Sequence, residues 1–221
     1  MERIDATGST VRFVAVVEVE PYVYSARPLP DVVGALSNPA VWDAYFRACM
    51  ADVEIHDLAP FEPGTAFVSL ATIARSAFLE RLVVDRVKDG PEFSPLCGGL
   101  SLVVDGKAVI LPTCCGDLGA LAEWERAMAS EEPTLVWRGH PQVRYEVAEG
   151  RVLLTEEWEY PPAPENLAEV TATVEQLAHA LADARLEIER FCVELESVTG
   201  KLTEDSVAAR VMARSLCGLP E

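Results

Sequence analysis

A heptad repeat near the C-terminus constrains this chain more than any other feature. Apolar residues recur there at alternating intervals of three and four residues, which places them along one face of a helix. The repeat consists of Leu167, Val170, Val174, Leu177, Leu181, Ala184, Ile188, Phe191, Leu195 and Val198. A mean spacing of about 3.5 residues keeps two helices in register around one another. We therefore predict a long amphipathic helix whose apolar face forms the seam of a homodimer.

The surroundings of the repeat leave a second interpretation open. The helix should run from about residue 165 to residue 199, between a proline-rich stretch and Gly200. Leu186 and Val193, which are also apolar, lie on its far side, so the helix could instead pack on its own domain. A short terminal helix over residues 203–217 could then fold back and cover them.

The proline-rich stretch at residues 161–164 is the predicted domain boundary. We expect residues 1–160 to form an α+β domain with a mixed or antiparallel sheet and short helices. Residues 161–221 should form a C-terminal helical segment, with the long helix and the short terminal one, that serves dimerisation. A chain of 221 residues, half of them hydrophobic, can bury a sizeable core.

Two β-hairpins are the clearest local predictions. One spans residues 100–111 around Asp105-Gly106, because Asp-Gly tolerates the positive φ angles of a two-residue turn. The other spans residues 143–159 with its turn at 148–150. The remaining predictions are strands over 11–20 and 53–58, helices over 31–36, 40–50 and 118–129 with Asp117 as the cap of the last, and either a helix or a strand over 66–87.

The charge of the chain narrows the choice of partner. It carries 36 acidic and 18 basic residues, a net charge of -18 at pH 7. Nucleic acid is not expected as a partner, because phosphate backbones attract clustered Lys and Arg. A basic peptide or protein would be steered to such a surface, although a merely solvated surface explains the charge as well. No apolar run is long enough for a membrane span, and we expect a cytoplasmic protein with reduced thiols and no membrane contact.

The most unusual stretch is Pro-Thr-Cys-Cys-Gly-Asp-Leu at residues 112–118, before a Trp-Arg-Gly-His-Pro segment. Cys114 or Cys115 could be a nucleophile, because the positive end of a following helix favours a thiolate. His140 would be its base and Asp117 the orienting group. The spacing does not require His140 to approach either thiol, so we favour a structural turn with inward-facing thiols. We predict no metal and no cofactor.

The same stretch carries a family resemblance. The Pro-x-Cys-Cys-Gly-Asp-Leu pattern, followed by Trp-x-Gly-His-Pro, resembles a pattern in a group of uncharacterised bacterial proteins. The resemblance covers about residues 97–158. It implies a shared fold, and it assigns neither a function nor a catalytic residue.

Three functions are compatible with these features. The first is a non-catalytic accessory, adaptor or immunity-type protein that offers an acidic surface or groove to a peptide or protein, where an exposed strand edge would suit an extended peptide. It is favoured by the acidity, the heptad repeat and the lack of nucleotide, zinc or serine-nucleophile motifs in the sequence. The alternative is a small cysteine-dependent enzyme that uses Cys114 or Cys115 with His140. The third is a scaffold that only oligomerises.

Overall fold

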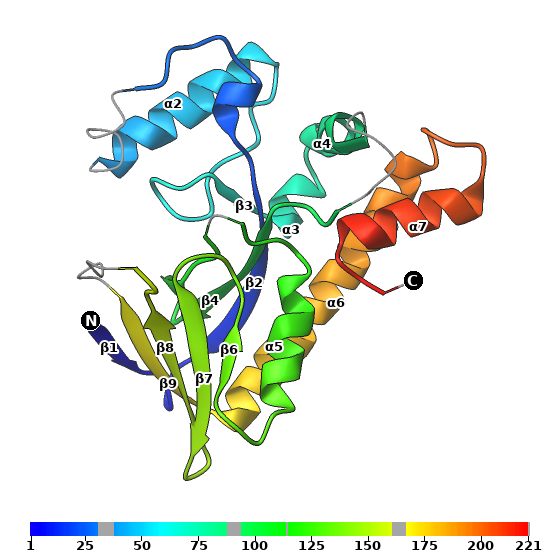
Figure 1. Cartoon of the computed structure of the whole chain (residues 1–221). Coiled ribbons are helices and arrows are strands. Elements are labelled where there is room, and N and C mark those ends of the chain that lie inside the picture. The colour runs from blue at the N-terminus through cyan, green and yellow to red at the C-terminus, as the bar shows by residue number, and fades with distance from the viewer. Residues whose placement is uncertain (31–37, 88–93, 114, 161–166, 221) are drawn as a thin grey trace.

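The chain is an α+β protein, as predicted (Figure 1). The computed structural model describes residues 1–30, 38–87, 94–113, 115–160 and 167–220. Two β-sheets and a long helix near the C-terminus form its framework. Among the described residues, no helix is both long enough and apolar enough to cross a membrane.

The first sheet has five strands in the order β1-β9-β8-β7-β6. They are β1 (Glu2–Asp5), β6 (Thr134–Val136), β7 (Gln142–Ala148), β8 (Arg151–Glu157) and β9 (Ala168–Thr173). β1 is parallel to β9 and the other pairs are antiparallel, so the sheet is mixed. The predicted hairpin over 143–159 is confirmed, with positive φ angles of 52° at Glu149 and 75° at Gly150 in its turn.

The second sheet has four strands in the order β3-β2-β4-β5, all antiparallel. They are β2 (Val11–Glu18), β3 (Phe67–Ser69), β4 (Gly98–Val104) and β5 (Lys107–Ile110). The predicted strand over 11–20 and the predicted hairpin over 100–111 are confirmed. Asp105 and Gly106 have φ angles of 49° and 85°, as a two-residue turn between right-twisted strands requires.

Seven helical segments complete the described chain. They are η1 (Pro21–Val23), α2 (Pro39–Asp52), α3 (Leu70–Ile73), α4 (Phe78–Val87), α5 (Ala120–Met128), α6 (Val174–Thr199) and α7 (Ser206–Leu216). The predicted helices over 40–50, 118–129 and 203–217 are confirmed, and the segment 66–87 is mostly helical. Asp117 as the cap of α5 is wrong: the N-cap residue is Gly119, and the Asp117 carboxylate bonds to the N–H of that residue, ahead of the helix. The helix expected over 31–36 lies outside the described residues.

The strand expected over residues 53–58 is wrong. α2 ends at Asp52, and the chain then turns at Glu54, whose φ is 61°. The backbone N–H groups of Val53 and Ile55 both donate to the carbonyl of Met50. Alternating apolar residues in this segment therefore cover the end of a helix instead of entering a sheet.

The long helix begins later than the heptad repeat predicted. Val170 lies in β9 and Leu167 precedes that strand, so neither belongs to the helix. α6 starts after Thr173, whose hydroxyl accepts a hydrogen bond from the N–H of Gln176, while the Gln176 side chain accepts one from the N–H of Thr173. This capping box stops the helix from extending toward the N-terminus. The β-branched residues before it alternate between buried and half-exposed positions, as a strand requires.

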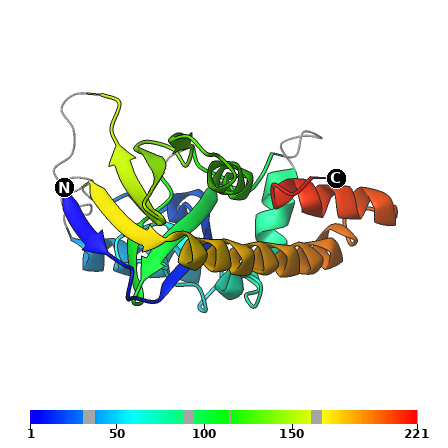
Figure 2. The same ribbon diagram turned by 90° about the horizontal axis from the view of Figure 1, so that it is seen from below.

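The heptad face of α6 is buried within the chain itself. Six of its residues are at most 5% exposed: Leu177, Leu181, Ala184, Ile188, Phe191 and Leu195. α6 packs along β2, and Figure 2 shows it running on from β9 with α7 folded back beside it. The second interpretation, a long helix packed on its own domain, therefore describes this structure. A homodimer stays a prediction, and its interface would have to use other residues.

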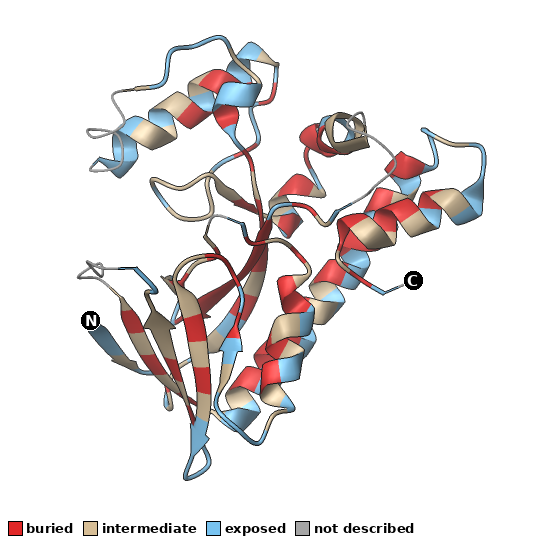
Figure 3. Cartoon of the chain, in the orientation of Figure 1, coloured by how far each residue is buried: buried red, intermediate tan, exposed pale blue. Residues whose placement is uncertain are grey.

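α7 returns along α6, but it does not cover the residues expected. The hydroxyl of Thr199 near the end of α6 donates to the carbonyl of Ala209, 2.8 Å away, and thereby ties the two helices together. Leu186 and Val193 remain 48% and 64% exposed on the opposite side of α6. In Figure 3 the buried residues of both helices lie on the sides that face the rest of the molecule.

One hydrophobic core joins the two sheets and the long helix. Phe13 of β2 and Trp124 of α5 contact one another in it, with ring centroids 4.7 Å apart. β9 lies after the expected boundary at residue 160, yet it pairs with β8, which lies before it. The segments on either side of that boundary therefore share one sheet and one core.

Candidate functional site

Within the Cys-Cys-Gly-Asp stretch, the described residues Cys115 and Gly116 lie in a tight turn against the segment that contains Arg138. Cys115 is exposed and has a φ of 67°, and the N–H of Gly116 donates to the carbonyl of Thr113. A Cβ atom at Gly116 would lie 2.7 Å from the carbonyl oxygens of both Arg138 and Gly98. Only glycine fits this close approach of three backbone segments. Cys114 lies outside the described residues.

The other two predicted catalytic residues are each engaged elsewhere. The carboxylate of Asp117 accepts a hydrogen bond from the N–H of Gly119, 2.8 Å away, just before α5. Nδ1 of His140 lies 3.1 Å from a carboxylate oxygen of Glu159, and its ring packs edge-on against Trp137. Within the described part of the chain, no hydrogen bond joins Cys115, Asp117 and His140. The cysteine-enzyme alternative, with Cys114 or Cys115 as the nucleophile, stays a prediction.

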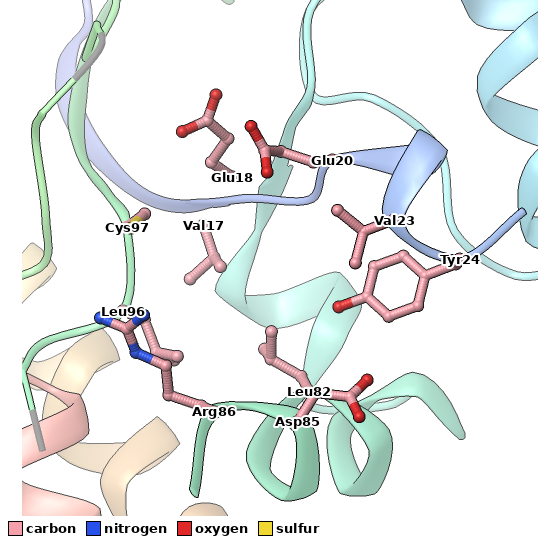
Figure 4. A pocket seen from close by; sticks show the side chains of 10 residues that line it. All are labelled: Val17, Glu18, Glu20, Val23, Tyr24, Leu82, Asp85, Arg86, Leu96 and Cys97. Atoms are coloured by element: carbon pink, nitrogen blue, oxygen red, sulfur yellow. The ribbon is translucent and has the colours of Figure 1, made fainter. Parts of the chain in front are cut away.

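A pocket of about 310 Å³ lies at the C-terminal end of β2, and we call it the Glu18 pocket (Figure 4). Its lining comes from β2, the segment around η1, α4 and the residues just before β4. The lining residues are Val17, Glu18, Glu20, Val23, Tyr24, Leu82, Asp85, Arg86, Leu96 and Cys97. The pocket therefore combines an apolar floor with carboxylates, a guanidinium, a phenol and a thiol.

Two carboxylates lie close together at one end of this pocket. Glu18 and Glu20 are two residues apart, and Figure 4 shows their carboxylates beside each other. Burial raises the pKa of Glu18, and the negative charge of Glu20 raises it further. The hydroxyl of Tyr22 donates a hydrogen bond to Glu20, which raises the pKa of Tyr22 to about 12. The charge of Glu20 thus produces a negative electrostatic potential at the half-buried carboxylate of Glu18.

The remaining charged groups of the pocket are held by neighbours. Arg86 donates hydrogen bonds to the hydroxyl of Ser94 and, at 3.4 Å, to the carbonyl of Pro95. Asp85 lies 3.7 Å from Arg81 one helical turn earlier, and the guanidinium of Arg81 lies over the ring of Tyr24. The acidic and basic residues of the lining are three carboxylates, Glu18, Glu20 and Asp85, and one arginine, Arg86. The lining is therefore net negative when the carboxylates are ionised.

Tyr24 and Cys97 form opposite walls of the pocket. Burial raises the pKa of Tyr24 to about 12, so its hydroxyl stays protonated, and Figure 4 shows it directed into the pocket. Burial also raises the pKa of Cys97, although the side chain remains exposed at the rim. The N–H of Glu18 donates to the carbonyl of Cys97, which fixes the Cys97 wall relative to β2. Both groups can donate hydrogen bonds to a ligand at neutral pH.

Sequence reasoning did not find this pocket. The carboxylates of Glu18 and Glu20 were visible at the end of a predicted strand, but they were not linked to Cys97 or to α4. Cys97 lies 79 residues after Glu18 along the chain, and the pairing of β2 with β4 brings the two together. The acidic pair after a β-branched strand was the one local signal available.

Comparisons of this chain with protein-family models, with curated proteins and with solved structures find no match. The shared fold implied by the bacterial resemblance stays a prediction.

Proposed function

We propose that this chain is a non-catalytic binding protein, of adaptor or immunity type, that recognises a basic peptide or protein. A cationic side chain of the partner enters the Glu18 pocket and lies between Glu18 and Glu20. A cytoplasmic location is part of the same proposal. So is dimerisation through a surface outside the buried heptad face.

The half-buried carboxylate of Glu18 carries this proposal. Its ionised form is disfavoured by burial and by repulsion from Glu20, and a ligand cation would relieve both costs. Val23 and Leu82 can pack against the aliphatic part of a Lys or Arg side chain, while the phenol of Tyr24 lies beside its polar end. The net charge of -18 would attract a basic partner from a distance.

The test uses a fluorescein-labelled lysine-rich peptide and a glutamate-rich peptide of equal length, measured by fluorescence anisotropy. We expect the lysine-rich peptide to bind and the glutamate-rich one to fail. Glu18→Gln should weaken binding by about three- to tenfold, whereas Glu149→Gln should change it by less than about twofold. Glu149 is the matched control because it loses the same charge at the tip of the β7–β8 hairpin, far from the pocket in Figure 1.

The salt dependence of the affinity distinguishes electrostatic recognition from apolar binding. Affinity for the lysine-rich peptide should fall between about 50 and about 500 mM salt, because ions screen exposed charges. Equal binding of both peptides, or equal effects of the two substitutions, would contradict the proposal.

A further inference from the structure

A second cavity lies beside the first half of β2, where that strand has an open edge. It has a volume of about 610 Å³ and lies between β2, α3 and α6. We call it the β2-edge groove. Its size is within the range of about 300–1,000 Å³ that ligand sites occupy. None of its lining residues belongs to the Glu18 pocket.

The open edge results from the shortness of β3. β3 pairs with β2 only from Val16 to Glu18, because α3 begins immediately afterwards at Leu70. On this side of β2, no strand of the described chain pairs with residues 11–15. Five residues of strand extend over about 17 Å, the length of a short bound peptide.

The pairing of β2 shows which backbone groups face this edge. The N–H of Glu18 donates to Cys97, and the carbonyl of Thr10 accepts from Asp105, so even-numbered residues bond toward β4. The backbone N–H and C=O groups of the odd-numbered residues therefore point away from β4, toward the groove. Ala15 demonstrates this, because its N–H donates to the carboxylate of Glu187 on α6, 3.4 Å away.

Glu187 takes the position that a carbonyl of a further strand would occupy. Burial raises the pKa of its carboxylate, although the N–H of Ala15 and the charge of Arg12 partly oppose this effect. The wall that α6 contributes also carries Asp183 and Glu194 against one cation, Arg190. With Arg12 on the β2 side, the whole groove lining carries three carboxylates and two arginines, so it is net negative by one charge, and Glu187 is its half-buried carboxylate.

We infer that the β2-edge groove binds an extended peptide segment that pairs with the backbone of Val11 and Phe13 and directs a Lys or Arg side chain toward Glu187. Strand addition supplies main-chain hydrogen bonds, and the carboxylate selects the basic residue. This site goes beyond the Glu18 pocket, since it would recognise the backbone as well as a charge. The apolar rings of Phe13 and Phe191 supply the floor on which the peptide would lie.

The first test selects random peptides displayed on phage against the intact protein and measures the synthesised winners by anisotropy. Ala71 is an exposed residue of the groove wall, so Ala71→Trp should fill the groove without disturbing the core. We expect this substitution to weaken the selected peptides by more than about tenfold, whereas Ala178→Trp, exposed on α6 away from the groove, should change affinity by less than about twofold. Glu187→Gln should reduce binding most for peptides that contain Lys or Arg.

The second test locates the bound peptide. Hydrogen exchange at the N–H groups of Val11 and Phe13 should slow on binding, because strand addition bonds them. If Glu18→Gln weakened every selected peptide and Ala71→Trp weakened none, the peptides would belong to the Glu18 pocket and this inference would be wrong. A doubling of mass in light scattering that Ala71→Trp abolishes would also overturn it, by assigning the edge to a second copy of the chain.

Discussion

The guanidinium of Arg138 and the carboxylate of Glu156 form a buried ion pair that ties the segment after β6 to β8. Arg138 is only 1% exposed, and it also donates to the carbonyl of Leu111. The second carboxylate oxygen of Glu156 accepts from the N–H of Ala168, 2.7 Å away, at the start of β9. This single pair therefore connects the cysteine-containing turn, the hairpin and the strand that leads into α6.

Removing the carboxylate of this pair should be costly. Glu156→Gln leaves the Arg138 charge buried without a counter-charge, which we expect to lower the free energy of unfolding by roughly 3–5 kcal/mol. Glu157→Gln is the matched control, because its partner Arg144 is 42% exposed and water screens such a pair, so its loss should change stability little. Urea denaturation of both variants measures the difference. Equal losses would show that Arg138 is not held by Glu156.

The placement of the heptad face predicts contrasting effects of two aspartates on α6. Leu181 is 5% exposed within the chain, so Leu181→Asp should destabilise the fold by more than about 3 kcal/mol through a buried charge. Val193 is 64% exposed, and Val193→Asp should change stability by less than about 0.5 kcal/mol. Circular dichroism with light scattering distinguishes the cases. A Leu181→Asp protein that stays folded while its mass halves would instead establish the heptad face as a dimer seam.

The raised pKa of Glu18 predicts a pH-dependent effect on stability. In the folded protein Glu18 holds its proton to a higher pH than its ordinary value of 4.5, so its stabilising contribution is complete below that pH and is lost as the pH rises through the folded pKa. The neutral amide of the Glu18→Gln variant mimics the protonated carboxyl. The variant should match the parent near pH 4 and exceed it near pH 7 by less than about 1 kcal/mol, since water screens the half-exposed group.

Thermal unfolding over this pH range checks the prediction, with Glu149→Gln as the control at an exposed site. A Glu18→Gln variant that is less stable than the parent near neutral pH would show that the ionised carboxylate is stabilised by a partner in the folded protein.

The rate at which each cysteine is alkylated should depend on its exposure to solvent. Cys97 and Cys115 are exposed, whereas Cys49, Cys192 and Cys217 are buried and should react only after unfolding. Burial raises the pKa of Cys97, so little of it is thiolate at neutral pH. Its labelling should therefore be slow at neutral pH and become faster as the pH rises. Mass spectrometry of iodoacetamide-treated protein gives the rates. Labelling of Cys114 or Cys115 much faster than all other cysteines would favour the enzyme alternative.

Much of the local structure could be predicted because it depends on neighbouring residues. Asp105-Gly106 is a pair that tolerates the positive φ angles of a two-residue turn, and Gly150 supplies the glycine of the second turn, so both hairpins could be predicted from neighbouring residues. Asp205 caps α7 through bonds to Val207 and Ala208, and the predicted terminal helix appears there. The heptad repeat correctly indicated an amphipathic helix over most of its length.

Tertiary structure decided what that amphipathic face covers. A period of 3.5 residues is compatible with a partner helix and with a sheet of the same chain, and the two alternatives differ only in contacts between distant residues. Val170 fits the repeat, yet it lies in β9, where pairing with Leu154 of β8 satisfies its backbone.

The candidate sites were likewise beyond local sequence. Glu18 meets Cys97 only because β2 pairs with β4, and Glu187 meets Ala15 only because α6 packs along β2. The sequence by itself determined the class of fold and the two hairpin turns, since the turns depend on residues a few positions apart. The burial of the heptad face and the positions of both cavities were decided by long-range packing, in which many contacts compete for the same apolar surfaces.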